Sequence, residues 1–332
     1  MLNADLKEFE FTSSFDELVI SAVIAVPVGN VCGVVQIVHG LNEHKERYYP
    51  FMDYLAEEGF ITVIHDCRGH GKSICTPDDL GFMFRNGGDG FVSDIAQLNK
   101  IIRETYPQLP IFMIAQGMGS VGARCYIKEH DDSLNGLVLL GTPCYSRFSP
   151  ITRCIHAVSS KKPGSRFRSE KIYDTVGSTL GKSFEQSENS WRCSDSEAVA
   201  EFNNDPLCSF KPTLNEYEEM LGLIRRAYSS GGWELKNPSL PVRFVSGKDD
   251  PCFISEKKFF SAVFSLEKIG YESISHRLFD GMRHEILNEK NSINVWKDIA
   301  KTLFSWIDRY NDAAAELVEE TPEETASDAE NI

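Results

Sequence analysis

IFMIAQGMGSVGARCYI, residues 111–127, is the stretch of sequence that decides the fold. Its apolar residues lead into a glycine-rich turn, and residues typical of a helix follow the turn. Residues 117–122, GMGSVG, match G-x-G-x-x-G, the loop that lets a backbone approach a dinucleotide pyrophosphate. In a second register, residues 115–119, AQGMG, resemble the strand–turn–helix motif G-x-S-x-G, with Gly117 at its centre. The two registers predict different chemistry, so the surrounding sequence must decide between them.

The dinucleotide register makes two demands that the sequence does not meet. The glycine loop should lie in the first βαβ unit, and an acidic residue should end the next strand and bind the ribose. Here the loop follows the fifth strand-like run, and the next run ends in LGTP, residues 140–143, without an acidic residue. A single G-x-G-x-x-G is also weak evidence in a chain with 24 glycines. We therefore expect neither a nucleotide site nor any other cofactor.

Length, composition and charge narrow the classes of protein to which the chain can belong. The 332 residues suffice for one large α/β domain with an insertion, or for two smaller domains. We expect no membrane span, because the sequence has no apolar run of the necessary length. We also expect no secretory signal, because no basic region precedes an apolar one at the start of the sequence. Transient contact with a membrane surface stays open. Nine cysteines without a C-x-x-C pair suit reduced thiols in a cytoplasm. The net charge of −15 argues against nucleic acid as a partner.

Short apolar runs flanked by turn residues alternate with amphipathic stretches along the chain. Such nearly continuous apolar runs are typical of buried parallel strands, and their alternation with helices predicts a doubly wound sheet. We expect about eight strands, the first two forming an antiparallel pair, at residues 8–12, 18–26, 33–38, 60–65, 111–115, 137–140, 242–245 and 274–279. The expected helices on the two faces of the sheet span residues 47–58, 91–106, 121–130, 255–269 and 292–310.

The alternation stops between Pro143 and Pro238, which predicts a helical cap, residues 143–238, inserted between core segments 1–142 and 239–310. Such an insertion lies over the carboxyl ends of the strands, where α/β proteins bind ligands. Thr213 and Glu216 form a capping-box pattern that begins one helix of this cap. Its apolar stripe either packs in the core or overhangs a lipophilic substrate, and consists of Leu214, Tyr217, Leu221, Ile224 and Tyr228.

The last 22 residues, 311–332, carry eight acidic residues and no basic one. They lack a sustained apolar face, so we expect a solvated and largely disordered tail rather than an interaction motif.

The second register requires an oxyanion-hole loop after an early strand, and then a nucleophile, an acid and a histidine in that order. The loops that follow the expected strands are HGLNEH at 39–44 with Arg47 and Tyr48 beyond it, DCRGHGKS at 66–73, SGKDDP at 246–251 and GMRHE at 281–285. Together with residues 115–119 they resemble the monoacylglycerol lipase and lysophospholipase group of α/β-hydrolases, also labelled serine aminopeptidase S33-like. The resemblance covers roughly residues 15–310 and implies the α/β-hydrolase fold with a helical cap.

The resemblance also implies the roles of individual residues. His284 would be the general base and Asp250 the acid that orients it; Asp249 competes for this role, but the family spacing G-x-x-D favours Asp250. The backbone N–H groups of Leu41 and Met118 would form the oxyanion hole. Six further residues are expected to brace loops rather than to act chemically: His39, Glu43, His44, Arg47, Arg68 and His70. The spacing of the eight histidines matches no metal-binding motif.

Gly117 is the departure from the family, which has serine at this position. Glycine supplies no nucleophile, so the acyl-enzyme route is closed. Gln116 and Ala115 also differ from the family motif, in ways that the turn should tolerate. Ser120 and Cys125 follow in the helix and are expected to pack there rather than to replace the nucleophile.

Two hypotheses remain. The chain is built to hydrolyse monoacylglycerol-like or lysophospholipid-like esters, and Gly117 inactivates this copy. Alternatively, it is a natural pseudoenzyme that binds an acyl ligand or a protein partner without turnover. Both predict a small lipophilic ester or acyl ligand under the cap, and the sequence leaves the oligomeric state open.

Overall fold

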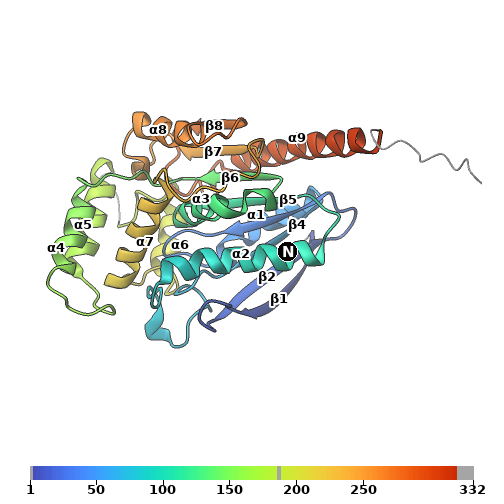
Figure 1. Cartoon of the computed structure of the whole chain (residues 1–332). Helices are drawn as coiled ribbons and strands as arrows, with labels where there is room; N and C mark the ends of the chain where they lie inside the picture. Colours follow the sequence, from blue (N-terminus) through green and yellow to red (C-terminus); the bar gives the residue numbers. More distant parts are fainter. Residues whose placement is uncertain (1–2, 185–187, 320–332) are drawn as a thin grey trace, which may run out of the picture.

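The structure, a computed structural model, describes residues 3–184 and 188–319 and contains one eight-stranded sheet of order β1-β2-β4-β3-β5-β6-β7-β8 (Figure 1). The strands are β1 (Ala4–Thr12), β2 (Val19–Pro27), β3 (Gly33–Val38), β4 (Phe60–His65), β5 (Ile111–Gln116), β6 (Gly136–Leu140), β7 (Val242–Gly247) and β8 (Ile274–Phe279). β2 pairs antiparallel with β1 and β4, and every other pair is parallel. The predicted fold class and the opening antiparallel pair are confirmed.

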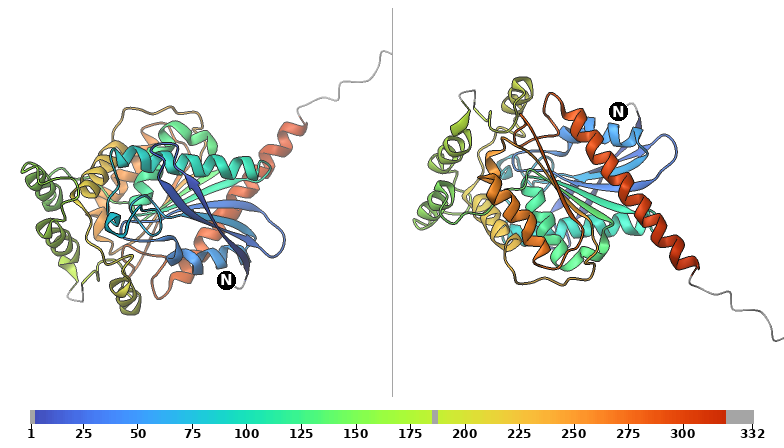
Figure 2. Two further views of the ribbon diagram at one scale, coloured as in Figure 1. Left: turned by 90° about the horizontal axis from the view of Figure 1, so that it is seen from below. Right: turned by 90° about the horizontal axis from the view of Figure 1, so that it is seen from above.

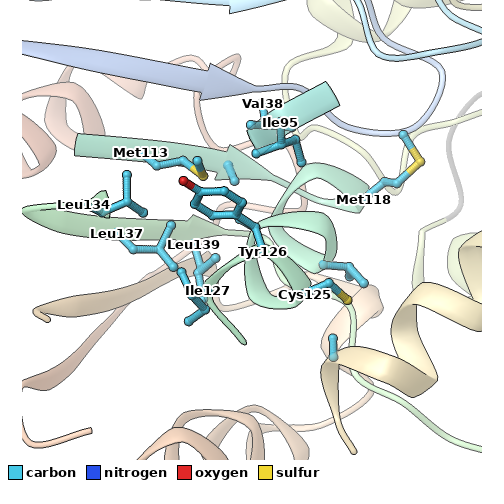
Figure 3. Close-up of a cluster of buried hydrophobic side chains, with 14 of the residues drawn as sticks. Val38, Ile95, Met113, Met118, Cys125, Tyr126, Ile127, Leu134, Leu137 and Leu139 are labelled. Atoms are coloured by element: carbon cyan, nitrogen blue, oxygen red, sulfur yellow. The ribbon is translucent and has the colours of Figure 1, made fainter. Parts of the chain in front are cut away.

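Helices cover both faces of the sheet, as the sequence predicts (Figure 2). One face packs against α2 (Gly87–Thr105), α3 (Met118–His130) and α8 (Glu256–Glu267), and the other against α1 (Tyr49–Glu57) and α9 (Ser292–Glu319). Alternate residues of β5 serve the two layers: Met113 lies with Tyr126 of α3 in the first (Figure 3), and Phe112 lies with Trp306 of α9 in the second. Side chains on successive strand residues point to opposite faces, so one fully apolar strand fills both cores.

Helix α9 is longer than the sequence predicts. We expected it to end at Tyr310, but the helix continues to Glu319 and extends beyond the sheet (Figure 1). The added residues include three consecutive alanines and then Glu316 and Leu317, all strong helix formers, and this intrinsic propensity overrides the acidic composition. The prediction of a disordered tail from residue 311 is therefore wrong for residues 311–319, and residues 320–332 lie outside the described part.

The described part of segment 143–238 contains helices and no strand. Its α-helices are α4 (Pro150–Ser159), α5 (Glu170–Leu180), α6 (Ser196–Asn204) and α7 (Leu214–Ala227), and they lie at the end of the molecule away from the terminus of α9 (Figures 1 and 2). Loops that leave the carboxyl ends of the strands bond to this segment: Asn42 Nδ2 donates to the carbonyl oxygens of Cys208 and Phe210, at 3.1 and 2.8 Å. We call this segment the helical insertion.

Helix α7 begins where the capping pattern predicts, but only half of the capping box forms. Thr213 Oγ1 accepts from the N–H of Glu216 at 3.3 Å, whereas the N–H of Thr213 donates to the carbonyl of Gly81. The apolar stripe of α7 takes the first of its two predicted roles, core packing: its N-terminal part joins a cluster with α4 and α5, and its C-terminal part packs on the main core. The members of the stripe are Leu214, Tyr217, Leu221, Ile224 and Tyr228.

Candidate active site

Gly117 forms a sharp turn between β5 and α3, at φ +53° and ψ −116°. This is a left-handed conformation, which a residue with a Cβ adopts only under strain. The other two glycines of the dinucleotide pattern serve close packing inside the protein. A Cβ on Gly119 would lie 2.4 Å from the carbonyl oxygen of Val38, and one on Gly122 would lie 2.2 Å from the Phe91 ring. All three glycines are thus explained by a strand–turn–helix elbow.

Asp250 and His284 come together from loops after β7 and β8. His284 Nδ1 lies 3.1 and 3.2 Å from the two carboxylate oxygens of Asp250, and both residues are buried. The carboxylate also accepts from Ser246 Oγ at 3.0 Å and from the N–H of Cys252 at 2.8 Å. Nδ1 therefore donates to Asp250, which leaves Nε2 facing away from the acid. Asp249, the competing acid, is exposed.

Nε2 of His284 points at the tip of the elbow. An ideal Cβ built on Gly117 would lie 3.0 Å from this nitrogen and 3.7 Å from the Cα of Gly40. The structure thus brings together the acid, the histidine and the central position of the elbow. Burial alone would lower the pKa of His284, but the neighbouring Cys252 and Asp250 outweigh it and hold the pKa well above its ordinary value.

Leu41 and Met118 flank this position from two elements. Met118 is the first residue of α3, so its N–H has no acceptor within the helix. In the loop after β3, the N–H of Gly40 donates to Glu43 Oε2 at 2.6 Å and that of Asn42 contacts His70 Nε2 at 3.2 Å. Among the described residues, neither the N–H of Leu41 nor that of Met118 donates to a protein acceptor outside a helix or strand.

His39 and Glu43 hold this loop, in line with the bracing expected of them. His39 Nε2 accepts from the N–H of Cys67 at 2.8 Å, so its proton is on Nδ1 and is donated to the carbonyl of Gly40. Burial lowers the pKa of His39 and keeps this tautomer neutral. Glu43 accepts from Tyr48 Oη at 2.7 Å in addition to its bond from Gly40.

Glu285, the residue after the histidine, ties three parts of the site together. Its carboxylate accepts from Arg47 Nη2 at 2.6 Å and from Arg192 Nη1 at 3.0 Å. Burial raises the pKa of Glu285, but the two guanidinium groups prevail and bring it to about 2. Arg192 also donates to the carbonyl of Leu41 at 3.2 Å, and the ring of Trp191 lies 5.4 Å from that of His284. Sequence reasoning missed Glu285, Trp191 and Arg192; only the position of Glu285 beside His284 was a signal.

Cys252 is a further residue that the sequence did not single out. Its thiol, a carboxylate oxygen of Asp250 and a ring nitrogen of His284 lie within 4.8 Å of one another. Burial raises the pKa of Cys252, against the opposing effect of the neighbouring His284. Ser120 and Cys125 behave as predicted: Ser120 Oγ donates to the carbonyl of Gly117 at 2.6 Å, and Cys125 is buried against α7.

Glu216 is a buried acid that forms no ion pair with a lysine or arginine of residues 3–184 and 188–319. Its Oε1 lies 3.1 Å from His70 Nε2, and neither side chain is exposed. Burial lowers the pKa of His70 to about 3 and raises that of Glu216 to about 8, so both groups are neutral near pH 7.

Glu216→Gln should therefore stabilise the protein at neutral pH. The pKa of Glu216 is higher in the folded protein than in the unfolded chain. Its contribution to stability is therefore fully present below pH 4.5 and is lost as the pH rises towards 8. The glutamine removes this loss, which amounts to up to about 3 kcal/mol at pH 7. Urea unfolding at pH 5 and pH 8 measures the effect. Glu218→Gln, at an exposed position of the same helix, is the control, and equal pH slopes for all three proteins would contradict the expectation.

Comparison with known proteins decides the family. The sequence pattern of the family described as "Serine aminopeptidase, S33" matches residues 29–291. The chain belongs to the serine aminopeptidase S33 family. A monoacylglycerol lipase of Mycolicibacterium smegmatis is 22% identical to the S33 protein over 279 residues, which cover 83% of this chain and 88% of that lipase. A monoglyceride lipase homolog of monkeypox virus is 20% identical over 85% of this chain and 91% of its own length.

Solved structures agree with this assignment. A thermostable carboxyl esterase from Bacillus coagulans, crystallised with glycerol, matches the S33 protein with a TM-score of 0.82 at 27% identity, over 91% of this chain and 99% of the esterase. The S33 protein is thus a monoacylglycerol lipase- and esterase-like α/β-hydrolase, which confirms the resemblance drawn from its motifs. In residues 3–184 and 188–319, no helix combines the length and the apolar character that crossing a membrane requires.

Proposed function

We propose that this S33 protein is built to hydrolyse carboxylic esters of the monoacylglycerol or lysophospholipid kind, and that the chain is inactive or nearly so because Gly117 stands where the nucleophile belongs. The supporting observation is that His284, backed by Asp250, aims Nε2 at an elbow position 3.0 Å away where the residue is glycine. Asp250 and His284 are the proposed acid and base, and Leu41 and Met118 the proposed oxyanion donors.

The chemistry stops at its first step. In acyl transfer a hydroxyl at the elbow attacks the ester carbonyl while the imidazole takes its proton. Glycine leaves the imidazole with nothing to activate except water. Loss of a triad nucleophile costs about a millionfold in turnover, and an oxyanion hole and binding alone retain roughly 10³–10⁴ over water. Main-chain donors do not depend on side chains, so the cradle for a carbonyl oxygen persists at Leu41 and Met118.

The names of the relatives indicate the ligand class. They include a monoacylglycerol lipase, a monoglyceride lipase homolog and a phospholipase of Bacillus subtilis. Carried over to this chain, they suggest monoacylglycerol-like or lysophospholipid-like esters. We place the acyl chain under the helical insertion, residues 143–238, which then acts as a cap. Trp191 of this cap would lie beside the ester group, because its ring neighbours His284.

A natural pseudoenzyme is the second candidate, and the space around Gly117 favours it. Real Cβ atoms rarely approach a neighbour as closely as 3.0 Å, so the imidazole occupies room that a side chain at residue 117 would need. The conformation of the turn also suits glycine, with φ at +53°. The close approach of the imidazole thus supports glycine as the natural residue at position 117.

Tryptophan fluorescence tests the binding proposal. Titration with a monoalkylglycerol ether, which no esterase can hydrolyse, should change the emission of the protein in a saturable manner. The change should disappear in Trp191→Phe and persist in Trp296→Phe, since Trp296 lies in α9 and packs against Phe51 and Tyr54 of α1. A saturable signal that survives Trp191→Phe, or none in the unmodified protein, would place the ligand elsewhere and overturn the proposal.

A further inference from the structure

A second constellation of chemically reactive side chains joins the loop after β3 to the helical insertion. His44 ends the HGLNEH loop, and Asp205 and Cys208 follow α6. His44 Nε2 lies 2.8 Å from Asp205 Oδ2, and a nitrogen of His44, an oxygen of Asp205 and the sulfur of Cys208 all lie within 4.8 Å of one another. His44 and Cys208 are buried, and Asp205 is partly exposed. One nitrogen, one oxygen and one sulfur therefore lie close together, and the oxygen belongs to a partly exposed residue.

The other nitrogen of His44 is held by a carboxylate. Nδ1 lies 2.7 Å from Glu46 Oε2, and Lys45 Nζ fixes the second oxygen of Glu46 at 3.1 Å. A proton on Nδ1 is thus directed to Glu46, and Nε2 faces Asp205, which lies in the cluster with Cys208. Metal-binding histidines nearly always donate their second ring N–H to a carboxylate, carbonyl or water in this way. The ring of His44 has the orientation of a metal ligand.

We propose that His44, Asp205 and Cys208 bind a zinc ion, with Glu46 orienting the histidine. Zinc takes nitrogen, sulfur and oxygen ligands at roughly 2.0–2.3 Å, which sets tetrahedral ligand atoms about 3.3–3.8 Å apart. The Asp205 oxygen, now 2.8 Å from His44 Nε2, must move slightly away from that nitrogen. The sulfur of Cys208 must lie at the ligand spacing from both atoms. The thiol proton and the proton shared by His44 and Asp205 pass to solvent as the metal bonds form. Three protein ligands leave the fourth position to water.

The cluster at the active site contains the same ligand types but is arranged differently. There Nδ1 of His284 donates to Asp250, which is itself a member of the cluster, and Nε2 faces Gly117. Of these two clusters in the described residues, the one at His44 therefore has a histidine that is oriented by a carboxylate outside the ligand set, Glu46.

The position of the ion gives it a structural role. His44 belongs to the loop that carries Leu41, whereas Asp205 and Cys208 belong to the insertion. A bound ion would fasten these two parts beside the existing hydrogen bonds from Asn42 to the insertion. Binding to the folded state alone raises stability by mass action, so zinc should raise the Tm by several degrees and a chelator should reverse the rise.

Cobalt is the probe, because a thiolate bound to Co²⁺ gives a charge-transfer absorption band. The full chain, reduced and freed of metal with a chelator, should bind one equivalent of Co²⁺ with this band, and Zn²⁺ should displace it. Cys208→Ser should abolish the band. Glu46→Gln should keep the band and weaken binding by about 10- to 100-fold. Cys252→Ser is the matched control, because it removes the thiol of the other cluster.

The outcomes are distinct. A band that survives Cys208→Ser, or that is lost in Cys252→Ser, would overturn the assignment of the ligands. Absence of any Co²⁺ and Zn²⁺ binding by the unmodified chain would overturn the site itself. Should Cys208→Ser fail to fold by circular dichroism, Asp205→Asn provides the second ligand variant, and it should weaken Co²⁺ binding at least tenfold. Equal affinity in Asp205→Asn would also contradict the site.

Discussion

Gly117→Ser should turn a chain with no ester turnover above background into a working hydrolase. The new hydroxyl would belong to the residue that faces His284 Nε2, and Nδ1 of the same imidazole already lies 3.1 Å from Asp250 Oδ2. The acid, the base and the oxyanion donors that we propose surround this residue, so the hydroxyl group alone should decide whether the covalent route is open. We expect the rate to rise by at least about 10³-fold, because a missing nucleophile costs about a millionfold and this site must first make room.

Room at the elbow limits the gain. The new Cβ would meet Nε2 at 3.0 Å, so the imidazole has to withdraw by a few tenths of an ångström. Serine must also adopt a φ near +53°, at a cost of roughly 1–3 kcal/mol. We therefore expect Gly117→Ser to be less stable than the unmodified chain by about this amount. Gly117→Ala carries the same Cβ and the same strain without the hydroxyl, which makes it the matched control.

Two assays measure this result. A fluorophosphonate probe should label Gly117→Ser but neither Gly117→Ala nor the unmodified chain, and p-nitrophenyl butyrate hydrolysis should follow the same order. Adding His284→Ala to Gly117→Ser should remove the gain. A folded but inert Gly117→Ser would show that the site has changed beyond one residue. Robust hydrolysis by the unmodified chain, lost on His284→Ala, would contradict the central role given to residue 117.

The sheet could be predicted because each buried strand carries its signal locally. In β3 and β5 every residue is buried, so the sequence shows a nearly continuous apolar run with turn residues on both sides. The expected bounds of β3, β4 and β8 match the structure, and β5 differs by one residue. Asp250 and His284 each follow an expected parallel strand, and loops after such strands lie at the same edge of the sheet, so both residues are expected there from the sequence.

The remaining parts of the site depend on contacts between distant segments, which no local pattern encodes. Arg192 meets Glu285 across 93 positions, and Asp205 meets His44 across 161. The spacing of the histidines showed no metal motif for this reason: the proposed ligands come from two segments that only the fold brings together. Glu216 had a local signal, the capping box. Its side chain does not complete the box, however, but lies buried beside His70.

Arg68→Met should cause the largest loss of stability among the residues expected to brace loops. Arg68 is fully buried, and its Nε donates to Asp94 of α2 at 2.9 Å while Nη1 donates to Asp16 at 2.9 Å. One guanidinium thus connects the loop after β4, helix α2 and the turn between β1 and β2. A Cβ built on Gly90 of α2 would lie only 2.3 Å from Cζ of Arg68, so α2 approaches the guanidinium closely.

Methionine keeps much of the volume and removes the charge. In the part of the chain that the structure describes, the buried carboxylate of Asp94 then keeps Ser13 Oγ as its one side-chain partner. Removing one partner of a buried ion pair costs about 3–5 kcal/mol. That is a large share of the roughly 5–15 kcal/mol by which native proteins are stable. Denaturant unfolding at pH 7 measures the loss, and Arg103→Met, exposed in the last turn of α2, should change stability by no more than about 0.5 kcal/mol.

The pH dependence separates an unpaired charge from lost packing. Burial already raises the pKa of Asp94 against the opposing effect of Arg68, and without Arg68 the pKa rises further. The penalty is then greatest where unfolded Asp94 is ionised, and it shrinks as the pH falls below about 4 and the carboxyl is protonated in both states. Arg68→Met with Asp94→Asn should likewise recover part of the loss at pH 7. A deficit that is the same at pH 4 and pH 7, and unchanged by Asp94→Asn, would mean that Arg68 acts through packing rather than through its charge.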